Sequence, residues 1–210
     1  MDDMRKTLFY EQKNGYDRID AAEKARQKVA GLLGTVPKSE HEWALARLTG
    51  VAPENWGTVP VSDETKDFPR CSVYFSHYLY EAGGLSQFLK GLELWKGYVK
   101  NGYFTSLEMP EPARSDCHGW GAHPLYHLVT KVAGVCPRGA FFEKVEIAPQ
   151  PGPFKRIRCG VPHAKGMIEL DLRFDGEACE GRIVLPEGLD GDFVWRGERM
   201  VLKAGENMIR

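Results

Sequence analysis

Six side chains that can do chemistry lie close together in a segment rich in glycine and proline: Glu108, Arg114, Asp116, His118, Trp120 and His123. Loops between rigid elements commonly carry function. Carboxylates and an arginine bind hydroxyl groups, and a flat aromatic ring packs against the C–H face of a sugar. These residue types therefore predict a site for a polar ligand such as a sugar. A structural interpretation fits them equally well, with a surface ion pair between Arg114 and Asp116 and a core position for Trp120.

The spacing of the histidines and of Cys117 also suggests two other kinds of site, a metal site and a thiol nucleophile. His118, His123 and His127 with Asp116 suggest a metal site, because histidines four residues apart on a helix can bind zinc. The glutamate of an HExxH zinc site is absent between His123 and His127, so we expect these histidines to pack in the core and expect no metal. Cys117 beside His118 suggests a thiol nucleophile, but adjacent residues rarely face one substrate together.

Helical periodicity dominates the chain before this segment. Apolar residues recur every three or four positions over residues 19–33, 39–48, 71–82 and 85–100. Ser39 with Glu42 is a capping-box pattern at a helix start. Gly83-Gly84 separates the stretch 71–82 from the stretch 85–100, and this predicts two helices joined as a hairpin. Residues 1–138 are thus expected to form a helical domain.

After Pro137 the period changes to two. Short β-rich runs cover residues 144–149, 154–163, 166–174, 180–186 and 192–209, separated by turn sequences containing proline or glycine. Residues 139–210 are therefore expected to form a small antiparallel β-sandwich. Helices followed by strands predict a segregated α+β fold and exclude alternating βαβ units.

The bulk composition excludes several kinds of partner. The 28 basic and 29 acidic residues leave no excess positive charge for nucleic acid or an anionic membrane. No apolar run approaches the roughly 20 residues of a membrane span. The first twenty residues lack the apolar centre of a secretion signal, and the five scattered cysteines form no CxxC pair. We expect reduced thiols and a cytoplasmic protein.

The segment from Arg114 to Pro124 reads RSDCHGWGAHP. It resembles a motif of glycoside hydrolase family 78, the bacterial α-L-rhamnosidases, in which the string is approximately RSDCHGWSAHP. Around it stand further features of that family: a tyrosine-rich helix ending in Ala82-Gly83, a Gly102-x-x-Thr105-x-x-Glu108 turn, and a strand ending at Pro149. The resemblance extends from about residue 73 to residue 210 and is weak before it.

The resemblance implies the end of a six-hairpin (α/α)6 barrel followed by a β-sandwich, and it implies inverting hydrolysis of α-L-rhamnosides without a cofactor. Inverting glycosidases use one carboxylic acid to protonate the leaving oxygen and one carboxylate to activate water. Glu108 matches the family's proposed general base. Arg114, Asp116, His118 and Trp120 are the candidate substrate-binding residues, and a nearby Arg114 would keep Glu108 ionised.

The acidic stretch that carries the family's general acid is not found in residues 1–70. Six helical hairpins also need far more chain than these helical residues supply. We therefore expect a C-terminal fragment of a rhamnosidase that is inactive in isolation and that associates with itself or with a complementing upstream chain. The alternatives are a non-catalytic carbohydrate-binding or interaction module, and a degenerate fragment without a ligand.

Overall fold

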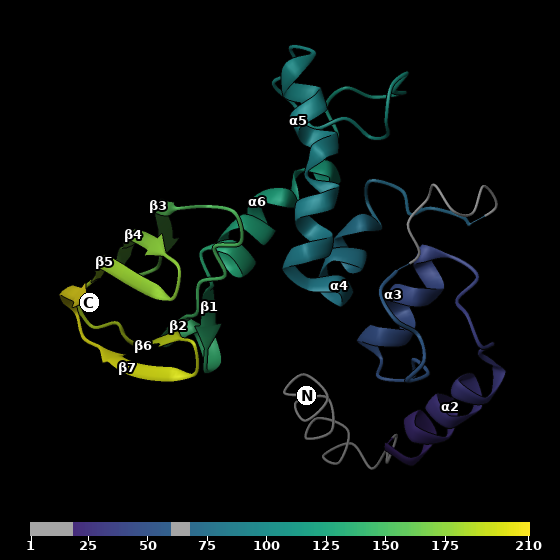
Figure 1. Cartoon of the computed structure of the whole chain (residues 1–210), viewed down its shortest axis with the longest axis horizontal. Helices are drawn as coiled ribbons and strands as arrows, with labels where there is room; N and C mark the ends of the chain where they lie inside the picture. The colour runs from purple at the N-terminus through teal and green to yellow at the C-terminus, as the bar shows by residue number, and fades with distance from the viewer. Residues whose placement is uncertain (1–18, 60–67) are drawn as a thin grey trace. The chain divides into compact units, whose positions relative to one another are not determined.

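The computed structural model describes residues 19–59 and 68–210. The chain divides into two compact units, Met1–Gly83 and Gly84–Arg210, which are described separately. Helices precede strands along the chain, as the colours of Figure 1 show, so the predicted α+β class is confirmed. The predicted domain boundary between residues 138 and 139 stays a prediction. Residues 1–18, on which the expectation of a missing secretion signal depends, lie outside the described residues.

The first unit contains α2 (Ile19–Leu32), α3 (Glu40–Leu48) and the beginning of α4 (Ser76–Gly91). The predicted capping pattern is confirmed, because the Ser39 hydroxyl accepts a hydrogen bond of 3.1 Å from the Glu42 amide. Trp43 and Trp56 are buried, and their indole N–H groups donate to backbone carbonyls. By contrast, Val29 on the apolar stripe of α2 is exposed.

Glycine interrupts the helical stretch that leads into the second unit. The backbone of α4 leaves helical geometry at Gly84, with φ 65° and ψ −157°. Only glycine adopts such a conformation without steric cost, so the predicted break lies at the predicted residue. The chain continues to Gly91, and α5 (Glu93–Lys100) follows. No helix within residues 19–59 and 68–210 has the length and apolarity needed to cross a membrane.

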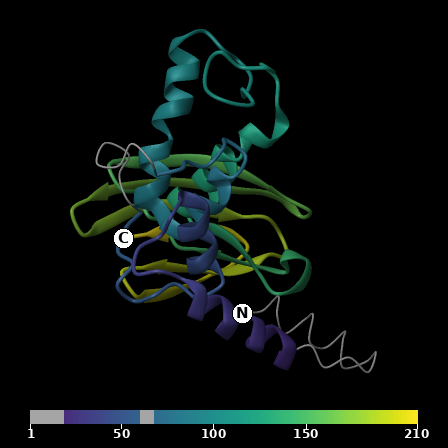
Figure 2. The ribbon, with the colours of Figure 1, turned by 90° about the vertical axis from the view of Figure 1, so that its right-hand side faces the viewer.

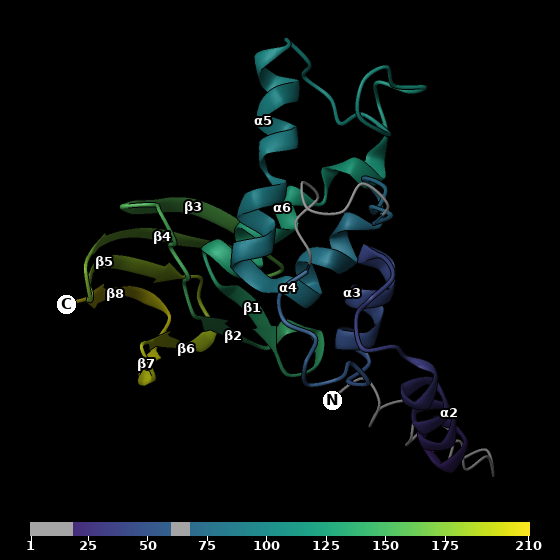
Figure 3. The same ribbon diagram turned by 45° about the vertical axis from the view of Figure 1, so that its right-hand side comes forward.

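Two four-stranded sheets make up most of the second unit. One has the order β1-β2-β6-β7 and the other β3-β4-β5-β8, and Figures 2 and 3 show them as two stacked layers. The strands of the first sheet are β1 (Val135–Arg138), β2 (Lys144–Ile147), β6 (Asp190–Trp195) and β7 (Glu198–Leu202). Those of the second are β3 (Arg156–His163), β4 (Gly166–Asp175), β5 (Ala178–Leu185) and β8 (Gly205–Ile209).

The alternation of apolar residues decides which face of each sheet is buried. Along β4, Ile168, Leu170, Leu172 and Phe174 are buried while the residues between them are exposed or half-buried. Such alternation is expected where one face of an antiparallel sheet packs on a core and the other meets water. One strand pair differs from the predicted antiparallel arrangement: β2 and β6 run parallel.

Candidate functional site

The polar segment after α5 is a closed loop rather than an extended connection. Its two arms are joined by backbone hydrogen bonds, from the His118 amide to the Ser106 carbonyl at 2.7 Å and from the Glu108 amide to the Ser115 carbonyl at 3.0 Å. Leu107, between the two pairings, is fully buried and anchors the loop on the unit. The backbone therefore places Glu108 across from the arm that carries Arg114 and His118.

Glu108 and Arg114 form a bidentate ion pair. Nε of Arg114 donates to Oε2 of Glu108 at 2.9 Å, and its Nη2 donates to Oε1. The glutamate side chain is only 8% exposed, whereas that of Arg114 is 77% exposed. The hydrogen bonds from Arg114 lower the pKa of Glu108 against the opposing effect of burial, with further lowering by the charges of Arg114 and His118. The carboxylate is thus ionised at neutral pH.

His118 and Trp120 form an aromatic pair beside this carboxylate. Their ring centroids are 4.2 Å apart, with planes inclined by 46°. Trp120 is the second residue of the 3-10 helix η1 (Gly119–Ala122), and 48% of its surface is exposed. The backbone of η1 is held by Trp95, whose indole N–H donates to the Gly121 carbonyl at 2.8 Å. A fixed, exposed indole next to an imidazole offers a stacking surface for a sugar ring.

Asp116 lies in a different setting. Its carboxylate is exposed and faces an open pocket, lined by Tyr103, Glu111, Pro112, Ala113 and Asp116. Its backbone carbonyl accepts a hydrogen bond from the Thr105 hydroxyl. The structure therefore pairs Glu108 with Arg114 and His118 with Trp120, with His118 close enough to act on the Glu108 charge. It places Asp116 apart from them, at a pocket on the same loop.

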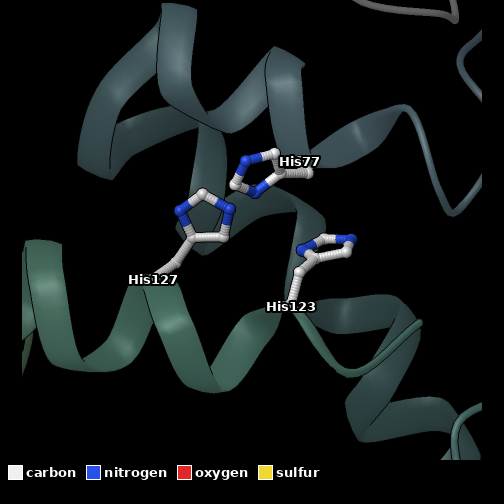
Figure 4. Close-up of side chains that lie close together, drawn as sticks. All are labelled: His77, His123 and His127. Atoms are coloured by element: carbon white, nitrogen blue, oxygen red, sulfur yellow. The ribbon is translucent and has the colours of Figure 1, made fainter. Parts of the chain in front are cut away.

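Of the histidines considered for a metal site, His127 ends α6 (Pro124–His127), His123 directly precedes this helix, and His118 precedes η1. The helix continues into the π-helical turn η2 (Leu128–Val132). Figure 4 shows His123 and His127 on the same side of α6, with ring centroids 5.5 Å apart. His127 is fully buried against Phe88, and His123 contacts Trp95 edge-on. These contacts support the expected packing role. His77, also drawn there, belongs to the first unit, where its ring contacts Tyr78.

Two residues of the pocket that Asp116 lines were not predicted from the sequence. Tyr103 and Glu111 lie in the same polar segment, but nothing in their spacing distinguishes them from ordinary surface residues. The one available signal was their position within a loop already rich in functional side chains.

The comparisons with known proteins address the fold. No family model and no curated protein matches the chain. Its structure is similar to that of the GH78 family rhamnosidase of Bacillus sp. GL1, with 24% identity and a TM-score of 0.67 over 75% of this chain and 19% of that one. It is also similar to the α-L-rhamnosidase from Aspergillus terreus, with 15% identity and a TM-score of 0.57 over 82% of this chain and 24% of that one.

A third similar structure is the Streptomyces avermitilis α-L-rhamnosidase complexed with L-rhamnose, with 13% identity and a TM-score of 0.51 over 80% of this chain and 21% of that one. The chain therefore spans about a fifth to a quarter of the length of these proteins. The resemblance seen in the sequence is confirmed at the level of the fold: this chain has the fold of one part of the family 78 α-L-rhamnosidases.

Proposed function

We propose that this chain is part of an inverting glycoside hydrolase that releases α-L-rhamnose, and that it supplies the general base, Glu108. The observation that carries this proposal is a nearly buried carboxylate, ionised through Arg114 and near His118, whose ring contacts the exposed Trp120. The similar structures support the substrate class, since each is named a rhamnosidase and one was solved with L-rhamnose.

As the base, Glu108 would remove a proton from the water that attacks the anomeric carbon. An ionised carboxylate oxygen has two acceptor positions, so each Glu108 oxygen keeps one for water after its hydrogen bond to Arg114. The bidentate pair also fixes the plane of the carboxylate, which orients the attacking water. The lowered pKa keeps Glu108 ionised at neutral pH and also lowers its affinity for the proton that it must accept from water.

Sugar recognition would fall to Trp120 and His118. The exposed indole can cover the apolar face of a pyranose ring, and the half-buried imidazole can exchange hydrogen bonds with its hydroxyl groups. Arg114 also has exposed surface, but its Nε and Nη2 are already engaged by Glu108. Any direct contact of Arg114 with the sugar would therefore fall to its remaining group, Nη1.

Inverting hydrolysis needs a second carboxyl group, about 6.5–9.5 Å from the base, to protonate the leaving oxygen. We propose that this acid belongs to another part of the intact enzyme and that the isolated chain does not hydrolyse rhamnosides. A second candidate function, sugar binding without hydrolysis, is favoured by the exposed Trp120 and by the engagement of both Glu108 oxygens with Arg114.

The test combines binding and turnover on the full chain. We expect methyl α-L-rhamnoside to bind, Trp120→Ala to weaken this binding about tenfold, and 4-nitrophenyl α-L-rhamnoside to release no nitrophenol. Absence of rhamnoside binding would contradict the proposed substrate. Release of nitrophenol that stops in Glu108→Gln would support the role of Glu108 as the base and contradict the need for an acid from elsewhere.

A further inference from the structure

The exposed face of the β3-β4-β5-β8 sheet contains two adjoining hollows. Figure 3 shows the four strands side by side in one layer. A hollow of about 570 Å³ lies over β4, β5 and β8, and one of about 440 Å³ lies over β3, β4 and β5. Both are lined by Asp171 and Arg182. Together the two hollows form one trough that crosses the strands.

A row of charged residues lies along this trough. The strand register places Arg158 opposite Asp171, and Asp171 opposite Arg182. Arg173 is two residues from Asp171 on β4, so both side chains point to the same face of the sheet. Arg156 already binds both oxygens of Asp171, at 2.8 and 2.7 Å. One carboxylate is thus surrounded by four guanidinium groups and is fully engaged by one of them.

The other three guanidinium groups have no protein anion to bind. Arg158, Arg173 and Arg182 are exposed, and none of them forms a hydrogen bond or an ion pair with another described residue. The hydrogen bonds from Arg156, and then the charges of Arg158 and Arg173, lower the pKa of Asp171 against the effect of burial. The row therefore carries more positive charge than its carboxylate neutralises.

The groups around the row indicate which anion fits. A guanidinium group binds a planar carboxylate through two parallel hydrogen bonds, as Arg156 does with Asp171. Two exposed glutamates, Glu169 and Glu180, flank the row on the same face. They repel closely spaced phosphate groups, and they accept hydrogen bonds from hydroxyl groups. A ligand that carries both carboxylates and hydroxyl groups matches all of these side chains.

Methionine side chains add apolar surface to the trough. Met208 of β8 lies opposite Arg182, and Met167 lines the hollow over β3. Both are about half exposed. Their adaptable thioether chains suit the C–H groups of a sugar ring. The distance across the four strands is three strand spacings, or roughly 14 Å, so the trough is long enough for more than one ring.

We propose that this trough binds an oligosaccharide that carries carboxylate groups, as a chain of uronic acids does. Arg158, Arg173 and Arg182 bind the carboxylates, while Glu169 and Glu180 accept hydrogen bonds from the hydroxyl groups. The inference is independent of the proposed function, because no residue of the trough belongs to the loop that carries Glu108. Such a site holds the protein on an acidic polysaccharide.

The test titrates trigalacturonic acid into the ¹⁵N-labelled full chain, with its methyl ester as the uncharged match, and follows the amide signals by NMR. We expect the acid to shift signals of β3, β4 and β5, and the ester to leave them unchanged. Arg158→Gln and Arg182→Gln should each weaken binding about tenfold through loss of a charged hydrogen bond. Their urea midpoints should not change, because neither guanidinium has a partner among the described residues. Lys144→Gln, on the other sheet, is the control for charge.

Gly160→Leu tests whether the ligand enters the hollow over β3. The change fills this hollow without altering the charge, and a Cβ atom there meets only the flexible end of Met167. Binding of the acid should therefore weaken while the fold is kept. Unchanged binding in Gly160→Leu would contradict a ligand seated in the trough. Binding of tripolyphosphate or of the methyl ester as tight as that of the acid, or no response to the acid, would overturn the proposal.

Discussion

The ion pair between Glu108 and Arg114 sets the chemical state of the candidate base. Burial alone would raise the pKa of a carboxyl group and favour its neutral form. Here the hydrogen bonds from Arg114 outweigh burial, and the net pKa of Glu108 is lowered. Arg114 is itself largely exposed, so the pair has one face in water and one in the protein.

Removing the arginine should therefore change the titration of Glu108. We expect Arg114→Ala to raise the pKa of Glu108 above its ordinary value of 4.5, because burial remains while the hydrogen bonds and the charge are lost. Arg114→Lys, which keeps the charge and loses the bidentate geometry, should give an intermediate pKa. Carboxyl ¹³C signals followed through a pH titration measure this, and a Glu108 pKa unchanged in Arg114→Ala would refute the account of the ion pair.

Among single residues, the sequence predicted which side chains of the site lie near one another better than it predicted the contacts that each one makes. Glu108, His118 and Trp120 were expected at one place, and Arg114 was expected beside the glutamate. The pocket around Asp116 could not be foreseen, because the direction of a loop side chain depends on turns that residue spacing does not define. Tyr98 lies within the predicted helical stretch 85–100, and only the structure shows that it is buried with its ring against that of Tyr103.

At the element scale, periodicity predicted strand content better than strand pairing. The run over residues 192–209 contains three strands, β6, β7 and β8, and the first two are separated by Arg196-Gly197 with positive φ at both residues. The strand β1 was not predicted, because its sequence VCPR contains a proline and shows no alternation. The parallel pairing of β2 with β6 joins segments distant in sequence, and local patterns carry no information on such partners.

Two glycines in the β3-β4-β5-β8 sheet provide a matched test of its packing. Gly181 of β5 has φ 140°, and a Cβ atom there would lie 2.1 Å from the Asp171 backbone oxygen. Gly160 of β3 would place a Cβ 3.2 Å from the flexible end of Met167. Gly181→Ala should therefore lower the free energy of unfolding by roughly 2–4 kcal/mol, from strain and overpacking, and Gly160→Ala by much less.

Urea denaturation of both variants measures this difference. Equal unfolding midpoints for Gly181→Ala and Gly160→Ala would show that the close approach of β5 to β4 does not constrain residue 181.

At the scale of the whole molecule, the change of period along the chain was enough to predict the α+β class. The matched part of the Bacillus sp. GL1 enzyme is only 19% of that protein. In the sequence, the partial match was indicated by the acidic stretch that is not found in residues 1–70. Val99 of α5, Leu125 of α6 and Phe104 of the loop between them are largely exposed. Exposed apolar side chains of this kind support the proposal that further helices, from another chain or a second copy, cover them.

Stability of the folded chain should depend on pH through its paired carboxylates. The pKa values of Glu108, Glu146 and Asp171 are lowered, chiefly by hydrogen bonds from Arg114, Arg138 and Arg156 respectively. A carboxyl whose pKa is lower in the folded state contributes stability above its unfolded pKa, and this contribution is lost as pH falls through the folded value. We expect the urea midpoint to fall steadily below about pH 4.5.

Glu146→Gln should flatten this dependence, since Glu146 also accepts a hydrogen bond from Arg199 and so links two arginines on one sheet. A midpoint that stays constant from about pH 7 to about pH 3 would contradict the assigned ion pairs.

In the proposed site, Glu108 faces the same bound sugar as His118 and Trp120. Titration of methyl α-L-rhamnoside into chain labelled with ¹³C-glutamate and ¹⁵N-tryptophan tests it directly. We expect the Glu108 carboxyl signal and the Trp120 indole signal to shift together with one dissociation constant, while the exposed Glu169 does not respond. A Trp120 signal that shifts to saturation while Glu108 stays unchanged would contradict it.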